Sequence, residues 1–271
     1  MKLSTSKNTT VIISDFVSEK YYSEIAKKSM SPIYLAAEQV GFLLPPDNKE
    51  SIIKLQMSGG EFCGNGVLAL GALSKYLGIV EDQNFLIEIS GADSPLQIEI
   101  LNNKLDKMEF EVKAAMPVDY SSKNFICHLG EENIQGRIIH LKGISHFILK
   151  GSKYFNEDLL QKIMKELSKN LSTEALGIIP YYIKNKKHCI KPFIFVRKNN
   201  SLVFEKGCGS GTLALGLHLV EKLKENIDLE VKQPGSKIKV EIKLNDNTQI
   251  CKNFLKGKVK LTTTGTLFIS R

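Results

Sequence analysis

The chain has 271 residues, 42% of them hydrophobic and 24% charged, a composition that is typical of a globular protein and excludes a disordered or fibrous one. No apolar run approaches the roughly 18 residues needed to span a bilayer, and the N-terminus lacks a signal-peptide pattern, so we expect a cytoplasmic protein with no membrane partner. The formal net charge of +8 comes mainly from lysines that are scattered along the chain and not grouped with aromatic residues, which predicts no nucleic-acid partner.

Short strands dominate the predicted elements, and several of them alternate apolar and polar residues as one-sided antiparallel strands do. In chain order, strands are expected at residues 11–13, 52–55, 85–89, 96–100, 108–112, 193–196, 202–204 and 237–242, and surface helices at 21–28 and 157–169. Residues 116–120 (Met-Pro-Val-Asp-Tyr) are expected to connect the two halves of the chain.

An internal repeat is the most informative feature of the sequence. Residues 63–71 (Cys-Gly-Asn-Gly-Val-Leu-Ala-Leu-Gly) recur as residues 208–216 (Cys-Gly-Ser-Gly-Thr-Leu-Ala-Leu-Gly), with seven of nine positions identical and an offset of 145 residues. In each copy a helix that is apolar on nearly every face follows a Gly-rich segment, and such a helix must be buried on all sides. The repeat therefore predicts two similar halves, each with an antiparallel sheet curled around its own buried helix.

Each repeat places a cysteine, Cys63 or Cys208, at the start of a buried helix. The first N–H groups of a helix have no partner within it and carry the positive end of the dipole, so they can bind a carboxylate. The same field stabilises a thiolate and is expected to lower the thiol pKa towards neutrality. Two such thiols on opposite faces of an α-carbon could remove a proton from one face and return one to the other. The sequence thus predicts acid–base chemistry at carbon.

The other three cysteines, Cys127, Cys189 and Cys251, lie in strand-like runs and are expected to be small buried hydrophobes. An odd number of cysteines without a Cys-x-x-Cys pair fits neither a disulfide framework nor a zinc finger. We therefore expect free thiols and no metal site.

At the two repeats the sequence resembles the diaminopimelate epimerase superfamily, whose members carry Cys-Gly-Asn-Gly in the first half and Cys-Gly-Ser/Thr-Gly in the second. The resemblance implies an α+β, diaminopimelate epimerase-like fold of two pseudo-symmetric domains, and an enzyme that uses neither pyridoxal phosphate nor a metal. It implies a first domain of residues 1–116 with a returning C-terminal strand at 264–271, and a second domain of residues 117–263.

The resemblance also implies the residues of the site. Cys63 and Cys208 would be the catalytic acid–base pair. The residues expected to bind the amino-acid substrate are Asn8, Gln39, Glu61, Gly64, Asn65, Glu205, Gly209 and Ser210. Gly64 and Gly209 would let the ligand approach the backbone, and Glu61 and Glu205 could meet an ammonium or imidazolium. The alternative interpretation of these two glutamates is that they are solvent-exposed loop carboxylates or partners of the helix dipole.

Two departures from the superfamily pattern bear on the substrate. Ile144 occupies the position of an asparagine that helps to hold the distal end of diaminopimelate. The arginine that would pair with its distal carboxylate is missing from residues 199–207, although Arg197 lies near that position. Losing such charged partners weakens recognition of a buried carboxylate by several kcal/mol. Around residues 37–42 and 59–63 the chain looks like the histidine racemases, a resemblance that implies histidine as the expected substrate.

Other interpretations stay open on the sequence alone. Within the same superfamily they are a diaminopimelate epimerase, a proline or hydroxyproline racemase-like enzyme, or a broad-spectrum amino-acid racemase. Outside it they are a non-catalytic amino-acid or anion binding protein that retains the fold, and a thiol-redox protein in which Cys63 and Cys208 pair. The oligomeric state is also open, with a homodimer as one candidate.

Overall fold

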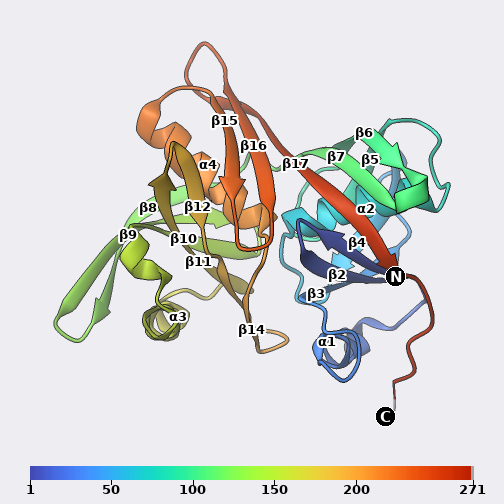
Figure 1. The fold of residues 1–271 in the computed structure, drawn as a ribbon, viewed down its shortest axis with the longest axis horizontal. Coiled ribbons are helices and arrows are strands. Elements are labelled where there is room, and N and C mark those ends of the chain that lie inside the picture. Colours follow the sequence, from blue (N-terminus) through green and yellow to red (C-terminus); the bar gives the residue numbers. More distant parts are fainter. Residues whose placement is uncertain (270–271) are drawn as a thin grey trace.

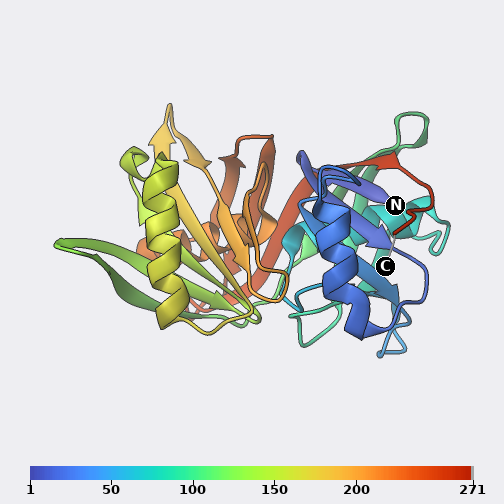
Figure 2. The same ribbon diagram turned by 90° about the horizontal axis from the view of Figure 1, so that it is seen from below.

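The computed structural model describes residues 1–269, which form seventeen strands and four α-helices in an α+β arrangement (Figures 1 and 2). The α-helices are α1 (Tyr22–Met30), α2 (Gly64–Tyr76), α3 (Glu157–Asn170) and α4 (Gly209–Leu223). Short 3-10 helices cover Glu19–Tyr21, Leu105–Lys107 and Ser152–Phe155. Within residues 1–269 no helix is long and apolar enough to cross a membrane.

Eight strands close into a barrel in the first half of the molecule. They pair in the order β1–β2–β3–β4–β5–β6–β7–β17 and back to β1. Their bounds are β1 (Lys2–Thr5), β2 (Asn8–Ile13), β3 (Gln39–Leu44), β4 (Ser51–Met57), β5 (Asn84–Ile89), β6 (Leu96–Lys104), β7 (Glu109–Ala115) and β17 (Ile250–Thr263). Helix α2 runs inside this barrel and contacts most of its strands.

The strands of the second half form a curved sheet that stays open. From β17 the order is β16–β15–β12–β11–β10–β9–β8, and β13 and β14 extend it beside β11. Their bounds are β8 (Ser121–Leu129), β9 (Glu132–Leu141), β10 (Ile144–Lys150), β11 (Ala175–Lys184), β12 (Lys187–Ile190), β13 (Phe193–Val196), β14 (Ser201–Phe204), β15 (Ile227–Lys232) and β16 (Lys237–Leu244). Among the described strands β8 pairs with β9 alone, so this sheet does not close around α4 and leaves an open seam beside β8.

One long strand joins the two halves, and its position corrects the sequence-based expectation. Residues 250–256 of β17 pair with β16, residues 254–260 with β7, and residues 259–263 with β1, so one continuous sheet replaces the two separate sheets that were expected. The prediction of a returning strand at 264–271 is wrong, because residues 264–269 belong to no strand and residues 270–271 lie outside the described part. The returning strand is β17, whose buried alternation from Asn253 to Leu261 ends before Thr264.

The two repeats form buried helices, as predicted. Every residue of α2 from Gly64 to Ser74 is buried, and α4 is buried from Gly209 to Leu217. Each helix has a glycine where a side chain of the surrounding sheet packs closely: a methyl group on Gly71 would come 2.9 Å from Ile98, and one on Gly216 would come 3.0 Å from Ile242. The glycines are therefore required for the sheets to wrap around the helices.

Candidate active site

The N-terminal ends of α2 and α4 meet at the junction of the two halves. A methyl group on Gly64 would come 2.9 Å from the carbonyl carbon of Gly209, and one on Gly209 would come 2.8 Å from that of Gly64. The absence of a side chain at both positions therefore lets the two helix ends touch. The role predicted for these glycines from the sequence, close approach of a ligand, remains a prediction.

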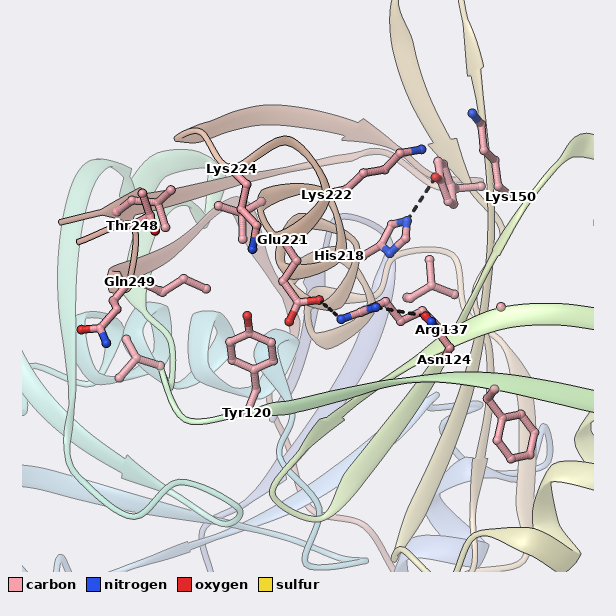
Figure 3. Close-up of a pocket in the computed structure, with 18 of the residues that line it drawn as sticks. Tyr120, Asn124, Arg137, Lys150, His218, Glu221, Lys222, Lys224, Thr248 and Gln249 are labelled. Carbon is pink, nitrogen blue, oxygen red and sulfur yellow. Dashed lines mark hydrogen bonds and ion pairs between the residues drawn. The ribbon is translucent and has the colours of Figure 1, made fainter. Parts of the chain in front are cut away.

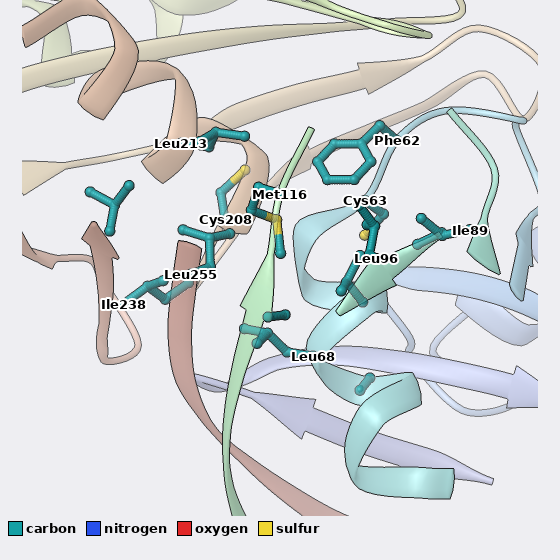
Figure 4. Packing of buried hydrophobic residues seen from close by; sticks show 14 of the residues in the cluster. Phe62, Cys63, Leu68, Ile89, Leu96, Met116, Cys208, Leu213, Ile238 and Leu255 are labelled. Carbon is teal, nitrogen blue, oxygen red and sulfur yellow. The ribbon is translucent and has the colours of Figure 1, made fainter. Parts of the chain in front are cut away.

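Both cysteines cap their helices with the same geometry. Cys63 has φ −130° and ψ 103°, and its Sγ accepts a hydrogen bond from Gly66 N at 3.2 Å. Cys208 has φ −124° and ψ 109°, and its Sγ accepts one from Gly211 N, also at 3.2 Å. Figure 4 shows both side chains within the hydrophobic cluster that continues from one half into the other. The sequence repeat thus corresponds to a repeated local structure around each thiol.

Hydrogen bonds cross the junction on both sides of the cysteines. Gln39 accepts from Cys63 Sγ at 3.1 Å and donates through Nε2 to Glu205 Oε1 at 2.6 Å, which links the first thiol to the second half. Asn65 donates to Gly207 O at 2.7 Å and accepts from Gly209 N at 3.1 Å. The side chain of Asn65 is therefore engaged within the protein and caps the opposite helix.

The second thiol has its own supporting groups. Ser210 Oγ lies 3.6 Å from Cys208 Sγ, and Gln233 accepts from Cys208 N at 2.6 Å while donating to Thr212 Oγ1 at 2.7 Å. Gln233, which follows β15, was missed by the sequence reasoning, since a glutamine before a Pro-Gly turn carries no signal of a role elsewhere. It fixes the backbone from which the Cys208 thiol projects.

The electrostatic surroundings of the thiols correct the expectation of a lowered pKa. Burial raises the pKa of both Cys63 and Cys208, and the nearby carboxylate of Glu205 raises both further. Glu61 adds to the effect on Cys63. The hydrogen bonds from Gly66 and Gly211 act in the opposite direction but are the smaller influence. In this closed structure both cysteines are therefore held as thiols.

Glu61 and Glu205 are buried, with 7% and 3% of their surfaces exposed, so the solvent-exposed interpretation of these carboxylates is wrong. Within the described residues each has one buried oxygen, Oε2, without a hydrogen-bond partner. Burial raises the pKa of Glu61, and it raises the pKa of Glu205 to about 7, although the neighbouring side chains of Cys208, Gln39 and Asn8 oppose the shift at Glu205. Two buried carboxylic groups with free acceptor atoms are available to a ligand.

A small cavity lies between the two halves and brings half of the ten predicted site residues together. Gln39, Glu61 and Cys63 line it from the first half, and Glu205 and Ser210 line it from the second. Its volume is about 30 Å³, roughly the share of one molecule in liquid water and far below the 300 Å³ or more of a typical ligand pocket. The structure is therefore closed around the site, and a substrate enters only if the halves move apart.

Some predicted residues lie beside this cavity. Cys208 is 2% exposed and reaches the cavity only through its neighbour Ser210. Asn8, on β2, is fully buried next to Glu205, and neither polar atom of its amide has a partner of good geometry within residues 1–269. The lining also includes Ser58 and Asn199, which the sequence reasoning missed because each lies in a polar turn without a recognisable motif.

The lining of the cavity is acidic. Glu38, Glu61 and Glu205 belong to it, and none of its described residues is lysine, arginine or histidine. Arg197, the remaining candidate partner for a distal carboxylate, is used elsewhere: it donates to Thr173 O and Ser168 O at 2.8 Å each, and to Leu171 O, at the end of α3. Ile144 does line the cavity, in place of an asparagine. The site thus offers nothing to neutralise a second carboxylate.

The remaining cysteines lie outside the site. Cys127 and Cys189 are buried in β8 and β12, as predicted, but Cys251 is exposed, because it lies at the start of β17, beyond the alternation that faces the core. All five cysteines are free. No group of three or more potential metal ligands occurs among residues 1–269.

A second and larger cavity, of about 1260 Å³, lies along the open seam of the second sheet (Figure 3). Among its lining residues Arg137 forms an ion pair with Glu221 at 2.6 Å. Tyr181 Oη, also in the lining, lies 3.3 Å from His218 Nε2. None of the residues predicted for the site lines this cavity.

Comparison with known proteins identifies the family. The sequence model described as histidine racemase CntK N-terminal domain matches residues 1–268. A histidine racemase of Fusobacterium nucleatum subsp. nucleatum is 28% identical, with 100% of this chain and 96% of the relative covered. A histidine racemase of Staphylococcus aureus (strain Mu50) is 25% identical, with 99% and 96% covered. The crystal structure of a probable proline racemase from Agrobacterium radiobacter K84 superimposes with a TM-score of 0.73 at 12% identity, covering 98% of this chain and 92% of the other, which shows a shared fold.

Proposed function

The chain belongs to the histidine racemase family, and we propose that it is an amino-acid racemase that interconverts L- and D-histidine, with Cys63 and Cys208 as its acid–base pair. The observation that carries the choice of substrate is the acidic lining of the interdomain cavity, which holds three glutamates and, among its described residues, no basic side chain. An amino acid whose side chain can carry a positive charge suits this lining, whereas the second carboxylate of diaminopimelate would be repelled by it.

In the proposed mechanism one cysteine acts as a thiolate and removes the α-proton, and the other acts as a thiol and protonates the opposite face. The N-terminal amides of α2 and α4 hold the substrate carboxylate and the negative charge that develops next to it. No pyridoxal phosphate or metal takes part. After one turnover the two sulfurs have exchanged protonation states, and the reverse reaction or proton exchange with water restores them.

The raised pKa of the thiols fits a mechanism in which the substrate activates the site. Glu205 raises the pKa of both thiols, and Glu61 raises that of Cys63. A substrate ammonium next to these carboxylates offsets their charge, which lowers the thiol pKa again. A thiolate therefore forms more readily once a cationic amino acid is bound than in the empty site.

We propose that two pseudo-symmetric domains, residues 1–116 and 117–263, each wrap their part of the sheet around a central helix, with the end of β17 completing the first barrel, and that the site lies between them. The matching caps at Cys63 and Cys208 support this division, as does the position of residues 116–120 between β7 and β8. The five free cysteines support a cytoplasmic location, since thiols stay reduced there. A homodimer remains a prediction.

A panel of purified L-amino acids, incubated with the enzyme in D₂O without pyridoxal phosphate, tests the proposal. Histidine, diaminopimelate, proline and hydroxyproline are followed by NMR for α-deuterium and by chiral chromatography for the D-isomer. We expect exchange and racemisation of histidine. Exchange confined to diaminopimelate would establish the epimerase alternative, and binding of histidine without any α-exchange would establish a binding protein.

A further inference from the structure

One wall of the cavity carries two unused hydrogen-bond acceptors. Asn199, in the turn between β13 and β14, is 5% exposed; its Nδ2 donates to Ser58 Oγ at 2.7 Å, which leaves Oδ1 buried without a partner among residues 1–269. Glu61 Oε2 is likewise buried and unpartnered there. Buried polar atoms in folded proteins are almost always hydrogen-bonded, so these two orphaned acceptors, like Glu205 Oε2 on the same cavity, indicate a ligand that donates hydrogen bonds.

The two acceptors come from opposite halves and belong to residues that line the same cavity. Glu61 precedes α2, and a methyl group on the neighbouring Gly59 would collide with both Glu61 Oε2 and Val196 at the end of β13. Gly59 is thus required for the carboxylate to fold against the β13–β14 hairpin that carries Asn199. The amide of Asn199 is oriented by Ser58, the residue before Gly59, so one short turn of the first half positions both groups.

Contacts outside the cavity hold the hairpin in this position. Ser23 Oγ on α1 donates to Lys198 O at 3.0 Å, and Lys198 forms an ion pair with Glu19 at 3.5 Å. The apolar side chains of Ile144, Ile194 and Val196 line the same cavity and could pack on the faces of a flat ring. The wall therefore combines apolar contacts with two acceptors at its polar edge.

We propose that Glu61 Oε2 and Asn199 Oδ1 form the subsite for the imidazole ring, each accepting one of the two N–H groups of an imidazolium; this inference rests on the proposed function. A neutral imidazole donates one hydrogen bond and accepts one, whereas the charged ring donates two. One proton is then shared between the ring and Glu61. The hydrogen bond between them therefore forms whether that proton lies on the ring nitrogen or on the carboxyl group. Phenylalanine lacks both donors, and a carboxylate side chain has the wrong charge.

The two methylated histidines, Nπ-methyl- and Nτ-methyl-L-histidine, provide the test because each lacks one of the two N–H donors. Kinetics of α-exchange are measured for histidine and both methylhistidines with the wild type, with Asn199→Leu and with the matched control Asn200→Gly. Asn200 lies in the same turn with φ 49°, a conformation that glycine adopts freely. Leucine has a volume similar to that of asparagine, but its side chain offers no hydrogen-bond acceptor.

For Asn199→Leu we expect KM for histidine to rise about 10- to 100-fold, the effect of losing a hydrogen bond to a charged group, with kcat little changed. One methylhistidine lacks the N–H that would donate to Asn199, and its KM should be nearly the same in Asn199→Leu as in the wild type. The KM of the other isomer should rise in the variant by about the same factor as the KM of histidine. Asn200→Gly should retain the wild-type KM for histidine within about threefold.

An equal rise in KM for all three substrates in Asn199→Leu would overturn the subsite, as would an unchanged KM for histidine. If Asn199→Leu fails to fold, the wild type still decides: equal KM values for histidine and both methylhistidines overturn the proposal. A wild type that exchanges no histidine α-proton at all contradicts the proposed function instead, so the two failures are distinguishable.

Discussion

Hydrogen bonding, not burial, separates the two thiols of the site from the other two buried cysteines. Cys127 and Cys189 are buried in their strands as well, but Cys63 and Cys208 each accept a backbone N–H at the start of a buried helix. That contact orients the sulfur and opposes the rise of its pKa. The chemistry we propose therefore depends on the helix caps.

Replacing either cysteine of the pair should stop racemisation. We expect Cys63→Ala and Cys208→Ala each to lower the rate of D-histidine formation by about 100- to 10,000-fold, the usual contribution of one general acid or base. Cys127→Ala, a buried thiol outside the site, is the control and should retain activity. The measurement is chiral chromatography of timed samples. A wild-type rate in either variant would remove that cysteine from the mechanism.

Glu205 should make the stability of the protein fall as the pH rises. Burial raises its pKa to about 7 from 4.5, so its contribution to stability is fully present below pH 4.5 and is lost as the pH passes through 7. Glu205→Gln mimics the protonated form. The free energy of unfolding of Glu205→Gln should equal that of the wild type near pH 4.5. Above pH 8 it should be higher than that of the wild type by about 3 kcal/mol, since one pKa unit corresponds to about 1.4 kcal/mol.

Urea unfolding at pH 4.5 and pH 8.5 measures this difference. Glu225→Gln, an exposed residue just beyond α4, is the control and should have the same small effect at both pH values. A difference between Glu205→Gln and the wild type that does not grow with pH would show that Glu205 is not held protonated by burial.

At the scale of elements, the decisive contact is between the ends of α2 and α4. The two helices could not meet if either Gly64 or Gly209 carried a side chain. Asn65 then completes the junction by capping the opposite helix through Gly209 N. The contact sets the spacing of the two thiols, because each cysteine directly precedes its glycine.

Gly64→Ala and Gly209→Ala should therefore push the two halves apart. Each added methyl group would lie within 3.0 Å of backbone atoms of the other helix end, and forced overpacking of this kind typically costs about 1–3 kcal/mol. We expect both variants to have a lower Tm. We also expect their activity at a temperature at which they remain folded to be lower than that of the wild type. Gly265→Ala, which would meet nothing within 4 Å, is the control; equal behaviour of all three variants would contradict the proposed spacing.

For the whole molecule, β17 and the β13–β14 hairpin determine how the halves can move. β17 ties them together as a continuous strand, whereas the hairpin contacts the first half through side chains: Ser23 bonds to Lys198 O, Lys198 pairs with Glu19, and Asn199 bonds to Ser58. Opening on the side of the hairpin therefore breaks side-chain contacts and no strand pairing, and it is the side on which the cavity lies.

Loss of the Ser23 contact should expose the buried thiols more often. Ser23→Ala removes one hydrogen bond of about 1 kcal/mol, which corresponds to about a fivefold higher population of the open form. We expect iodoacetamide to modify Cys63 about five times faster in the variant, as followed by mass spectrometry of digested samples. Cys251, which is exposed, provides an internal control and should react at one rate in both proteins. An unchanged rate at Cys63 would place the opening elsewhere.

Local pattern was enough to predict the two halves, the buried helices and the cysteine pair. The repeat at residues 63–71 and 208–216 is visible as letters, and an all-apolar helix has no stable position except inside a sheet. The acidic character of the site was partly visible too, because Glu61 and Glu205 lie close to the two cysteines in sequence. These features depend on residues that are neighbours in the chain.

Tertiary structure decided what depends on residues far apart. Burial of Glu205 against Gln39, 166 residues away, reverses the predicted direction of the thiol pKa shift. Asn199 and Ser58, 141 residues apart, meet only across the junction. The returning strand was predicted too close to the C-terminus. Its position is determined by the pairing of β17 with three other strands and not by the local pattern of its own residues. Desolvation and strand pairing are properties of the packed molecule, and no local stretch of sequence contains them.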